Sequence, residues 1–197
     1  MLGDIGCTSF YPSKNLGAFG DGGALFTNNE MLGERAKMIA NHGQNRRYYH
    51  DVVGVNSRLD SIQAAILDIK LKHLDTYIKN RQRLADTYDE ALKDIPEIQI
   101  PVRQSNSTHV FHQYTLRIKN GKRDALQSFL KEKDIPSMIY YPVPLYGQKA
   151  YQHYISSAFE LPNTEILCQE VLSLPMHTEM DAEQSAYICS HIIDFFR

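Results

Sequence analysis

The order of apolar and polar residues along the chain predicts a mixed α/β protein. Short apolar runs at residues 5–10 and 23–27 are typical of buried strands, and residues 29–41 place apolar side chains at helical spacing. From Ser57 to Ile95 the apolar positions recur mostly in steps of three and four residues or their multiples. This recurrence predicts one long helix with at most one break.

The rest of the chain predicts a smaller unit that also mixes strands and helices. Its strands are expected at residues 98–102, 109–118 and 136–140, and its helices at residues 124–133, 163–171 and 182–195. No internal repeat and no linker rich in glycine and serine interrupts the sequence. The fold class is therefore α/β.

Composition and charge favour chemistry on a small molecule. The chain of 197 residues is 43% hydrophobic and 22% charged, with a formal net charge of -2. Without a long block of lysine and arginine, nothing indicates a surface for nucleic acid or for an anionic membrane. No apolar run approaches the length of a membrane span, and the first residues lack the features of a signal peptide, so we expect a cytoplasmic protein. The three scattered cysteines predict reduced thiols.

Two histidines, His109 and His112, have a spacing that suggests a metal pair. On the predicted strand, residues three apart face opposite sides, and no cysteine or carboxylate at ligand spacing completes a set. We therefore expect structural or surface histidines and no metal site.

The candidate for chemistry is Lys14, which lies in the run Ser9-Phe10-Tyr11-Pro12-Ser13-Lys14-Asn15-Leu16-Gly17 and is followed by Gly20-Asp21-Gly22-Gly23-Ala24. A neutral lysine amine can form a Schiff base with an aldehyde such as pyridoxal phosphate. Taken alone, however, a lysine in a glycine-rich turn is more often a solvated loop residue. The order of residues in this run is a more specific signal of function than its glycine content.

A second block, Val53-Gly54-Val55-Asn56-Ser57-Arg58-Leu59-Asp60-Ser61-Ile62-Gln63-Ala64-Ala65, follows further along the chain. Taken alone, Asn56 and Ser57 could cap a helix, with Asp60 completing a capping box. Together, the two blocks resemble the DegT/DnrJ/EryC1/StrS family of sugar aminotransferases, which have fold type I and depend on pyridoxal phosphate.

The resemblance implies a role for each matching residue. Lys14 would carry the cofactor, and the Ser9 hydroxyl would donate to its phosphate. Asn56 would reach the phosphate bound by the other subunit, which implies a homodimer with shared active sites. Arg58 would meet an acidic sugar or the carboxylate of the amino donor, although an ion pair with Asp60 is an equally good interpretation.

The segment Tyr140-Tyr141-Pro142-Val143-Pro144-Leu145-Tyr146 resembles the family's Tyr-Pro-x-Pro-Leu segment, which lines the sugar-nucleotide side of the site. Tyr140 and Tyr141 are therefore candidate substrate-binding residues. Many members have histidine where this chain has Tyr140 and Tyr146. The alternative is a turn stiffened by proline with packed aromatic rings.

The resemblance also implies a partial protein, because the family carries its cofactor lysine about midway along the chain. The sequence therefore resembles the C-terminal part of a fold type I enzyme. We expect residues 1–56 to end a large domain that binds pyridoxal phosphate, residues 57–95 to form a long linking helix, and residues 96–197 to form a small C-terminal α/β domain.

The implied reaction transfers an amino group, with glutamate as the expected donor, to a nucleotide-linked keto sugar. The wording from Gly54 to Ala65 favours a UDP-linked 3-oxo sugar for surface polysaccharides. One alternative is an inert remnant or a dimerisation fragment, because the motifs that stack on the cofactor ring are missing. Another is a sugar dehydratase, a branch in which histidine replaces the lysine, and Lys14 argues against it.

Overall fold

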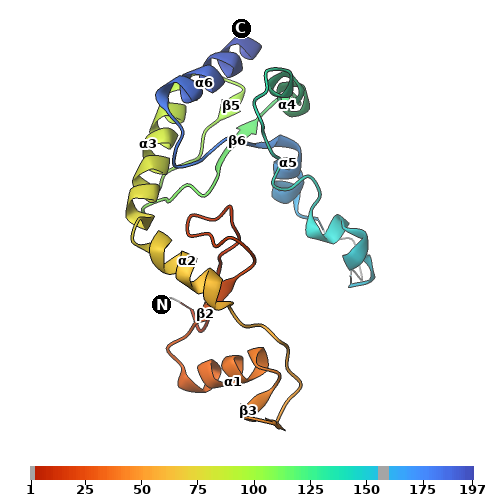
Figure 1. The fold of residues 1–197 in the computed structure, drawn as a ribbon. Coiled ribbons are helices and arrows are strands. Elements are labelled where there is room, and N and C mark those ends of the chain that lie inside the picture. Colours follow the sequence, from red (N-terminus) through yellow and green to blue (C-terminus); the bar gives the residue numbers. More distant parts are fainter. Residues whose placement is uncertain (1–2, 155–159) are drawn as a thin grey trace. The chain divides into compact units, whose positions relative to one another are not determined.

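The computed structural model describes residues 3–154 and 160–197, and its contacts divide the chain into two units (Figure 1). The first unit ends at Thr76, and the second runs from Tyr77 to Arg197. The boundary falls near the start of helix α3 (Leu74–Leu92), so residues 57–76 group with the first unit and the rest of the expected linking segment groups with the second.

In the described residues of the first unit there are two antiparallel strand pairs and two helices. Its elements are β1 (Gly6–Ser9), β2 (Gly23–Phe26), α1 (Glu30–Ala40), β3 (Gln44–Arg46), β4 (Tyr49–His50) and α2 (Ser61–Leu71). β1 pairs with β2 and β3 pairs with β4. Asn29 caps α1, since its side chain accepts a hydrogen bond from the Leu32 N–H at 3.2 Å.

The first unit buries few apolar side chains. Among its described residues, only Ala18 and Leu67 are buried hydrophobic residues, whereas Phe19 is 75% exposed and Ile62 is 73% exposed. An isolated two-stranded hairpin is marginally stable in water without an apolar face packed against other elements. The first unit therefore has little hydrophobic core of its own.

The second unit is built on a three-stranded antiparallel sheet with the strand order β5-β6-β7. Besides α3, its elements are β5 (Ile98–Gln99), β6 (Tyr114–Ile118), α4 (Arg123–Glu132), the 3-10 helices η1 (Leu145–Gly147) and η2 (Lys149–Tyr154), α5 (Pro162–Glu170), β7 (Val171–Leu174) and α6 (Ala182–Phe196). Tyr114 of β6 lies opposite Leu174 of β7.

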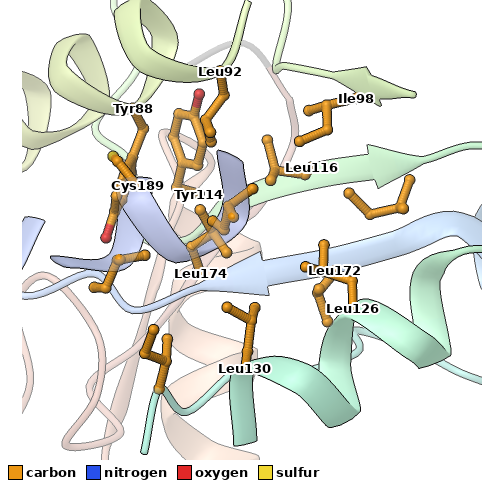
Figure 2. Close-up of a cluster of buried hydrophobic side chains, with 14 of the residues drawn as sticks. Tyr88, Leu92, Ile98, Tyr114, Leu116, Leu126, Leu130, Leu172, Leu174 and Cys189 are labelled. Carbon is orange, nitrogen blue, oxygen red and sulfur yellow. The ribbon is translucent and has the colours of Figure 1, made fainter. Parts of the chain in front are cut away.

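Side chains from three helices and from all three strands form the hydrophobic core of the second unit. Tyr114, Leu116 and Ile118 alternate along β6 and are fully buried, as expected for a strand with one face on a core. Figure 2 shows Leu126 and Leu130 of α4 pointing toward the sheet and Tyr88 and Leu92 reaching in from α3. The second unit therefore has a hydrophobic core made of its own residues.

Arg81 of α3 is buried at the edge of this core and holds two distant segments. Its Nη1 atom donates to the carbonyl oxygens of Phe111, His112 and Met176 at 3.1, 3.0 and 3.2 Å. Burial lowers the pKa of Arg81, but a guanidinium stays protonated in proteins. The charge is therefore used to bind backbone carbonyls.

The strand predicted at residues 109–118 begins only at Tyr114. The His109 ring accepts a hydrogen bond from the Phe111 N–H at 2.9 Å, and Phe111 has a positive φ of 44°. Arg81 takes the carbonyls of Phe111 and His112, so this part of the chain cannot continue the ladder. His109 is thus a backbone-binding residue of a loop.

Two other predictions differ from the structure, and one hairpin was not predicted. The strand expected at residues 136–140 is reduced to a single bridge between Met138 and Ser173, because proline at position 136 has no N–H to donate. β7 occupies Val171, which was predicted to end a helix, and residues 172–174, which were expected only to separate two helices. The β3–β4 hairpin was not predicted. The long helix predicted with at most one break agrees with the structure, in which the break falls at residues 72–73, between α2 and α3.

Within residues 3–154 and 160–197, no helix combines the length and the apolar character that crossing a membrane would require. The same residues contain no group of three histidine, cysteine, aspartate or glutamate side chains placed to hold a metal ion.

Candidate active-site loop

Lys14 lies in a loop that the backbone closes between β1 and β2. The Ala18 N–H donates to the Phe10 carbonyl at 2.7 Å, and the Phe10 N–H donates to the Gly22 carbonyl at 2.8 Å. Within the loop, the Lys14 N–H donates to the Tyr11 carbonyl at 2.9 Å. Lys14 is partly buried, and these bonds fix the backbone from which its side chain extends.

Gly17 allows this loop to fold tightly on itself. A Cβ atom at Gly17 would lie 2.4 Å from the Pro12 carbonyl oxygen and 2.9 Å from that of Tyr11. No larger residue fits there without moving the backbone on which Lys14 sits. The glycine is therefore required for the close approach of the two ends of the loop.

Ser9 and Lys14 are connected through Tyr11. The Ser9 Oγ atom accepts a hydrogen bond from the Tyr11 N–H at 3.2 Å, and the Tyr11 carbonyl accepts from Lys14. A serine hydroxyl that accepts one bond can still donate its proton. The exposed Ser9 hydroxyl is thus available to an anionic group near the loop.

Asn56 lies on an extended segment that runs beside the end of α1. It forms a β-bridge with Asn41, and the neighbouring Ser57 N–H donates to the Ala40 carbonyl at 2.8 Å. The Asn56 Oδ1 atom accepts a hydrogen bond from the Arg58 Nε at 3.0 Å. The two exposed side chains therefore form a pair.

This geometry replaces two alternatives that the sequence left open. Helix α2 begins at Ser61 with Asp60 at the N-cap position, and Asp60 makes no side-chain capping bond, so Asn56 and Ser57 do not cap it. No ion pair between Arg58 and Asp60 occurs among the ion pairs of the described residues. Arg58 instead donates to Asn56.

Gly43 shapes the turn that leads to this segment, and its replacement is expected to destabilise the chain. Gly43 has a φ of +74°, and a Cβ atom there would lie 1.7 Å from the Val52 carbonyl oxygen. A Gly43→Ala variant should lose about 2 kcal/mol or more of unfolding free energy, measured by urea denaturation, since strain and a backbone clash add together.

Gly121→Ala is the matched control for this prediction. Gly121 has a φ of +66°, but nothing lies within 4 Å of the position of its Cβ atom. The Gly121→Ala variant should therefore lose only about 1 kcal/mol of unfolding free energy, from the backbone strain alone. Equal losses in the two variants would mean that the clash at Gly43 is relieved at no cost.

Tyr140 and Tyr141 lie in the second unit. Their rings are 5.6 Å apart and nearly perpendicular, at 74°, and Tyr141 is 71% exposed. Nearby in sequence, the Tyr146 hydroxyl donates to Glu165 of α5 at 2.7 Å, and this bond raises the pKa of Tyr146 to about 12. The structure thus groups Ser9, Lys14, Asn56 and Arg58 in one unit and the tyrosines in the other.

Two features of the first unit were missed by sequence reasoning. In the β3–β4 hairpin, Arg46 stacks 3.7 Å from the centre of the Tyr49 ring, and Arg47 lies 5.0 Å from that of Tyr48. The run Arg46-Arg47-Tyr48-Tyr49 in the sequence was the signal that could have indicated these stacked pairs. The second feature is that Gln63 and Lys70 of α2 bind the loop after Lys14. Their shared helical face could have indicated this.

The residues of the first unit suit a phosphate-bearing aldehyde cofactor. They offer a primary amine in a closed glycine-rich loop, a hydroxyl next to it through Tyr11, and an amide paired with a guanidinium. An amine of this kind forms Schiff bases, and hydroxyl and amide groups bind phosphate oxygens. These groups are the ones that a pyridoxal phosphate site requires of its lysine-bearing part.

The chain belongs to the DegT/DnrJ/EryC1/StrS aminotransferase family, whose family model matches residues 1–193. This match confirms the family and the fold class expected from the two sequence blocks. The family is pyridoxal phosphate-dependent. The chain spans about half the length of the curated relatives that it matches.

Two curated relatives and one solved structure illustrate the match. A "Pleiotropic regulatory protein" of Geobacillus stearothermophilus is 44% identical over all of this chain and 53% of its own length. The UDP-2-acetamido-2-deoxy-3-oxo-D-glucuronate aminotransferase of Pseudomonas aeruginosa is 43% identical over 96% of this chain and 51% of its own. DesV of S. venezuelae, solved in complex with a ketimine intermediate, superposes with a TM-score of 0.92 at 37% identity, over 99% of this chain and 52% of DesV.

Proposed function

We propose that this chain contributes the lysine-bearing part of a pyridoxal phosphate-dependent aminotransferase that acts on a nucleotide-linked keto sugar. The observation that carries the proposal is the closed loop around Lys14 in a chain of this family. Pyridoxal phosphate, when bound, supplies an aldehyde carbon for an amine and a conjugated ring that accepts electrons. Relatives with the names of nucleotide-sugar aminotransferases support the substrate class.

Lys14 and Ser9 have separate tasks in this proposal. The Lys14 Nζ atom attaches the cofactor and then moves a proton to and from the substrate carbon that exchanges the amino group. The Ser9 hydroxyl donates to the cofactor phosphate while its Oγ atom keeps the bond from the Tyr11 N–H. Tyr11 links the Ser9 hydroxyl to the backbone of Lys14, so both residues belong to one hydrogen-bonded loop.

Asn56 and Arg58 act as a pair in this proposal. The bond from the Arg58 Nε fixes the Asn56 carbonyl oxygen, so the Asn56 NH₂ group points away from it and can donate to a phosphate. The remaining N–H groups of Arg58 suit a carboxylate of the sugar or of the donor. We place the Asn56 amide in the site of a second subunit of a homodimer.

The finer parts of the proposal concern substrate and location. The name of the Pseudomonas relative supports a UDP-linked 3-oxo sugar as substrate. We further propose glutamate as the amino donor and surface polysaccharide as the pathway of the product. Tyr140 and Tyr141 would contact the substrate. Cys7, Cys168 and Cys189 are free thiols, which supports a reducing compartment such as the cytoplasm.

Trapping with borohydride tests the proposal in the intact protein. Reduction in the presence of pyridoxal phosphate, followed by peptide mass mapping, is expected to place the pyridoxyl group on Lys14. Lys37 of α1, an exposed lysine of the same unit, is the internal control and should stay unlabelled. A label on Lys37 in place of Lys14 would refute the role of Lys14. No label on any lysine would favour the alternative that this chain is inert or serves only in dimerisation. The small hydrophobic core of the first unit is the observation that favours this alternative.

A further inference from the structure

Helix α2 contacts the loop that carries Lys14 at two points. The Gln63 Oε1 atom accepts a hydrogen bond from the Phe19 N–H at 2.8 Å. About two turns further along α2, the Lys70 Nζ atom donates to the Gly17 carbonyl at 2.5 Å. Both bonds end on the backbone segment that closes the loop after Lys14.

The residues of α2 that bind the Lys14 loop lie on one face of the helix. Gln63, Leu67 and Lys70 are spaced by four and three residues, so they share a helix face, and Leu67 is buried between the two polar residues. The Lys70 ammonium also lies 5.7 Å from the centre of the Phe19 ring. Ile62 and Ile69 are exposed and lie elsewhere on the helix.

The loop is shaped to receive Gln63. A Cβ atom at Gly20 would lie 3.2 Å from the Gln63 Nε2 atom, so a larger residue there would press on the amide. Ala18, between the two bonded residues, is fully buried. The backbone from Gly17 to Gly20 is therefore fixed from the side of α2 and has little room to move.

We infer that Gln63 and Lys70 are positioning residues that set the direction of the Lys14 side chain. Gly17 is bound by Lys70 and packs on Pro12, two residues before Lys14. A bond from a charged donor is stronger than one between neutral groups, so Lys70 is the stronger of the two ties. This inference rests on the proposed role of Lys14, and it makes Lys70 a residue that serves the reaction without touching substrate.

The same helix joins the two sequence blocks physically. α2 starts three residues after Arg58 and ends at Leu71, so the paired Asn56 and Arg58 precede it directly. A shift of α2 would therefore move both the Lys14 loop and the end of the segment that carries Asn56 and Arg58. Small displacements of reacting groups reduce rates strongly.

Amide hydrogen exchange tests the loop contact without any cofactor. In the intact protein, Gln63→Leu is expected to speed exchange at the Phe19 amide about fivefold, because the side-chain acceptor is lost. Gln63→Glu keeps an oxygen acceptor of the same length and should leave the Phe19 amide protected. Unchanged exchange in Gln63→Leu would overturn the inference, whatever the fate of the proposed function.

Steady-state kinetics test the consequence for Lys14. Lys70→Met is expected to lower kcat for amino transfer about tenfold with little change in KM for the sugar, and Lys70→Arg should restore most of it. Lys72→Met, at the C-cap that follows α2, removes an exposed ion pair with Asp68 and is the matched control, with unchanged kcat. Equal kcat in Lys70→Met and Lys72→Met would overturn the inference. Faster Phe19 exchange in a protein whose Lys14 is never labelled would refute the proposed function and leave the loop contact standing.

Discussion

Equal amounts of Lys14→Ala and Asn56→Ala subunits, allowed to exchange, are expected to regain about one quarter of the activity of the unaltered homodimer. Each variant alone should be inactive or weak, because one lacks the amine and its proton transfer, worth about a hundredfold to ten-thousandfold, and the other lacks a phosphate contact. If Asn56 serves the neighbouring site, a hybrid dimer contains one site with both residues intact. Half of the dimers are hybrids, and half of their sites are restored.

The matched control for this experiment mixes Lys14→Ala with Ser9→Ala. Ser9 and Lys14 are connected through Tyr11 within one chain, so no hybrid of these two variants contains an unaltered site. Amino transfer would be measured after mass spectrometry has established subunit exchange. Absence of recovery in the Lys14 and Asn56 mixture, despite exchange, would place both residues in the same subunit's site.

Replacing Arg81 by alanine is expected to lower the unfolding free energy of the 197-residue chain by about 3 kcal/mol. The change removes the donors that bind the carbonyls of Phe111, His112 and Met176, and these groups lie at the edge of the core. Buried carbonyl groups that lose their hydrogen-bond donor reduce the unfolding free energy, and the alanine side chain makes no new interaction that offsets this loss. Urea denaturation, followed by far-UV circular dichroism, would measure the loss.

Two further variants separate hydrogen bonding from packing. Arg83, two residues along α3, is exposed, and Arg83→Ala should change the unfolding free energy by less than about 0.5 kcal/mol. Arg81→Met keeps an apolar side chain of comparable length but has no N–H donors. If the hydrogen bonds are what stabilises the chain, Arg81→Met should lose nearly as much unfolding free energy as Arg81→Ala. Equal stability of Arg81→Ala and Arg83→Ala would contradict the assigned role.

The helices could be predicted from the sequence because their stabilising contacts are local or repeat at helical spacing. The prediction of residues 29–41 agrees with α1 and its Asn29 cap, and that of residues 182–195 agrees with α6, whose Asp181 and Gln184 form a capping box. Helix-capping residues and apolar positions at helical spacing lie within a few residues of one another in the sequence. A single sequence therefore carries enough information to place these elements.

Strand boundaries depended on residues far away in the chain. β6 starts at Tyr114 because Arg81, some thirty residues earlier, takes the carbonyls of the preceding loop. β7 was missed because Val171 to Leu174 is a short, wholly buried run, which does not show the alternation of a half-exposed strand. Tertiary contacts decided both cases.

The candidate site divides in the same way. Lys14, Ser9, Asn56 and Arg58 were identified from the wording of two blocks, since physical reasoning alone favoured a solvated lysine. The bond between Arg58 and Asn56 became visible only with coordinates. So did the contacts from α2 to the loop, because they join residues more than forty positions apart.

The distribution of core residues across the second unit determines when that unit can become stable during synthesis. Its core draws on Leu84 and Tyr88 near the start of the unit and on Ile188 and Ile192 in the last helix, α6. Most of the unit must therefore leave the ribosome before its interior can close. A premature stop codon before α6 would leave these apolar side chains exposed, and the product would be a substrate for chaperones and proteases.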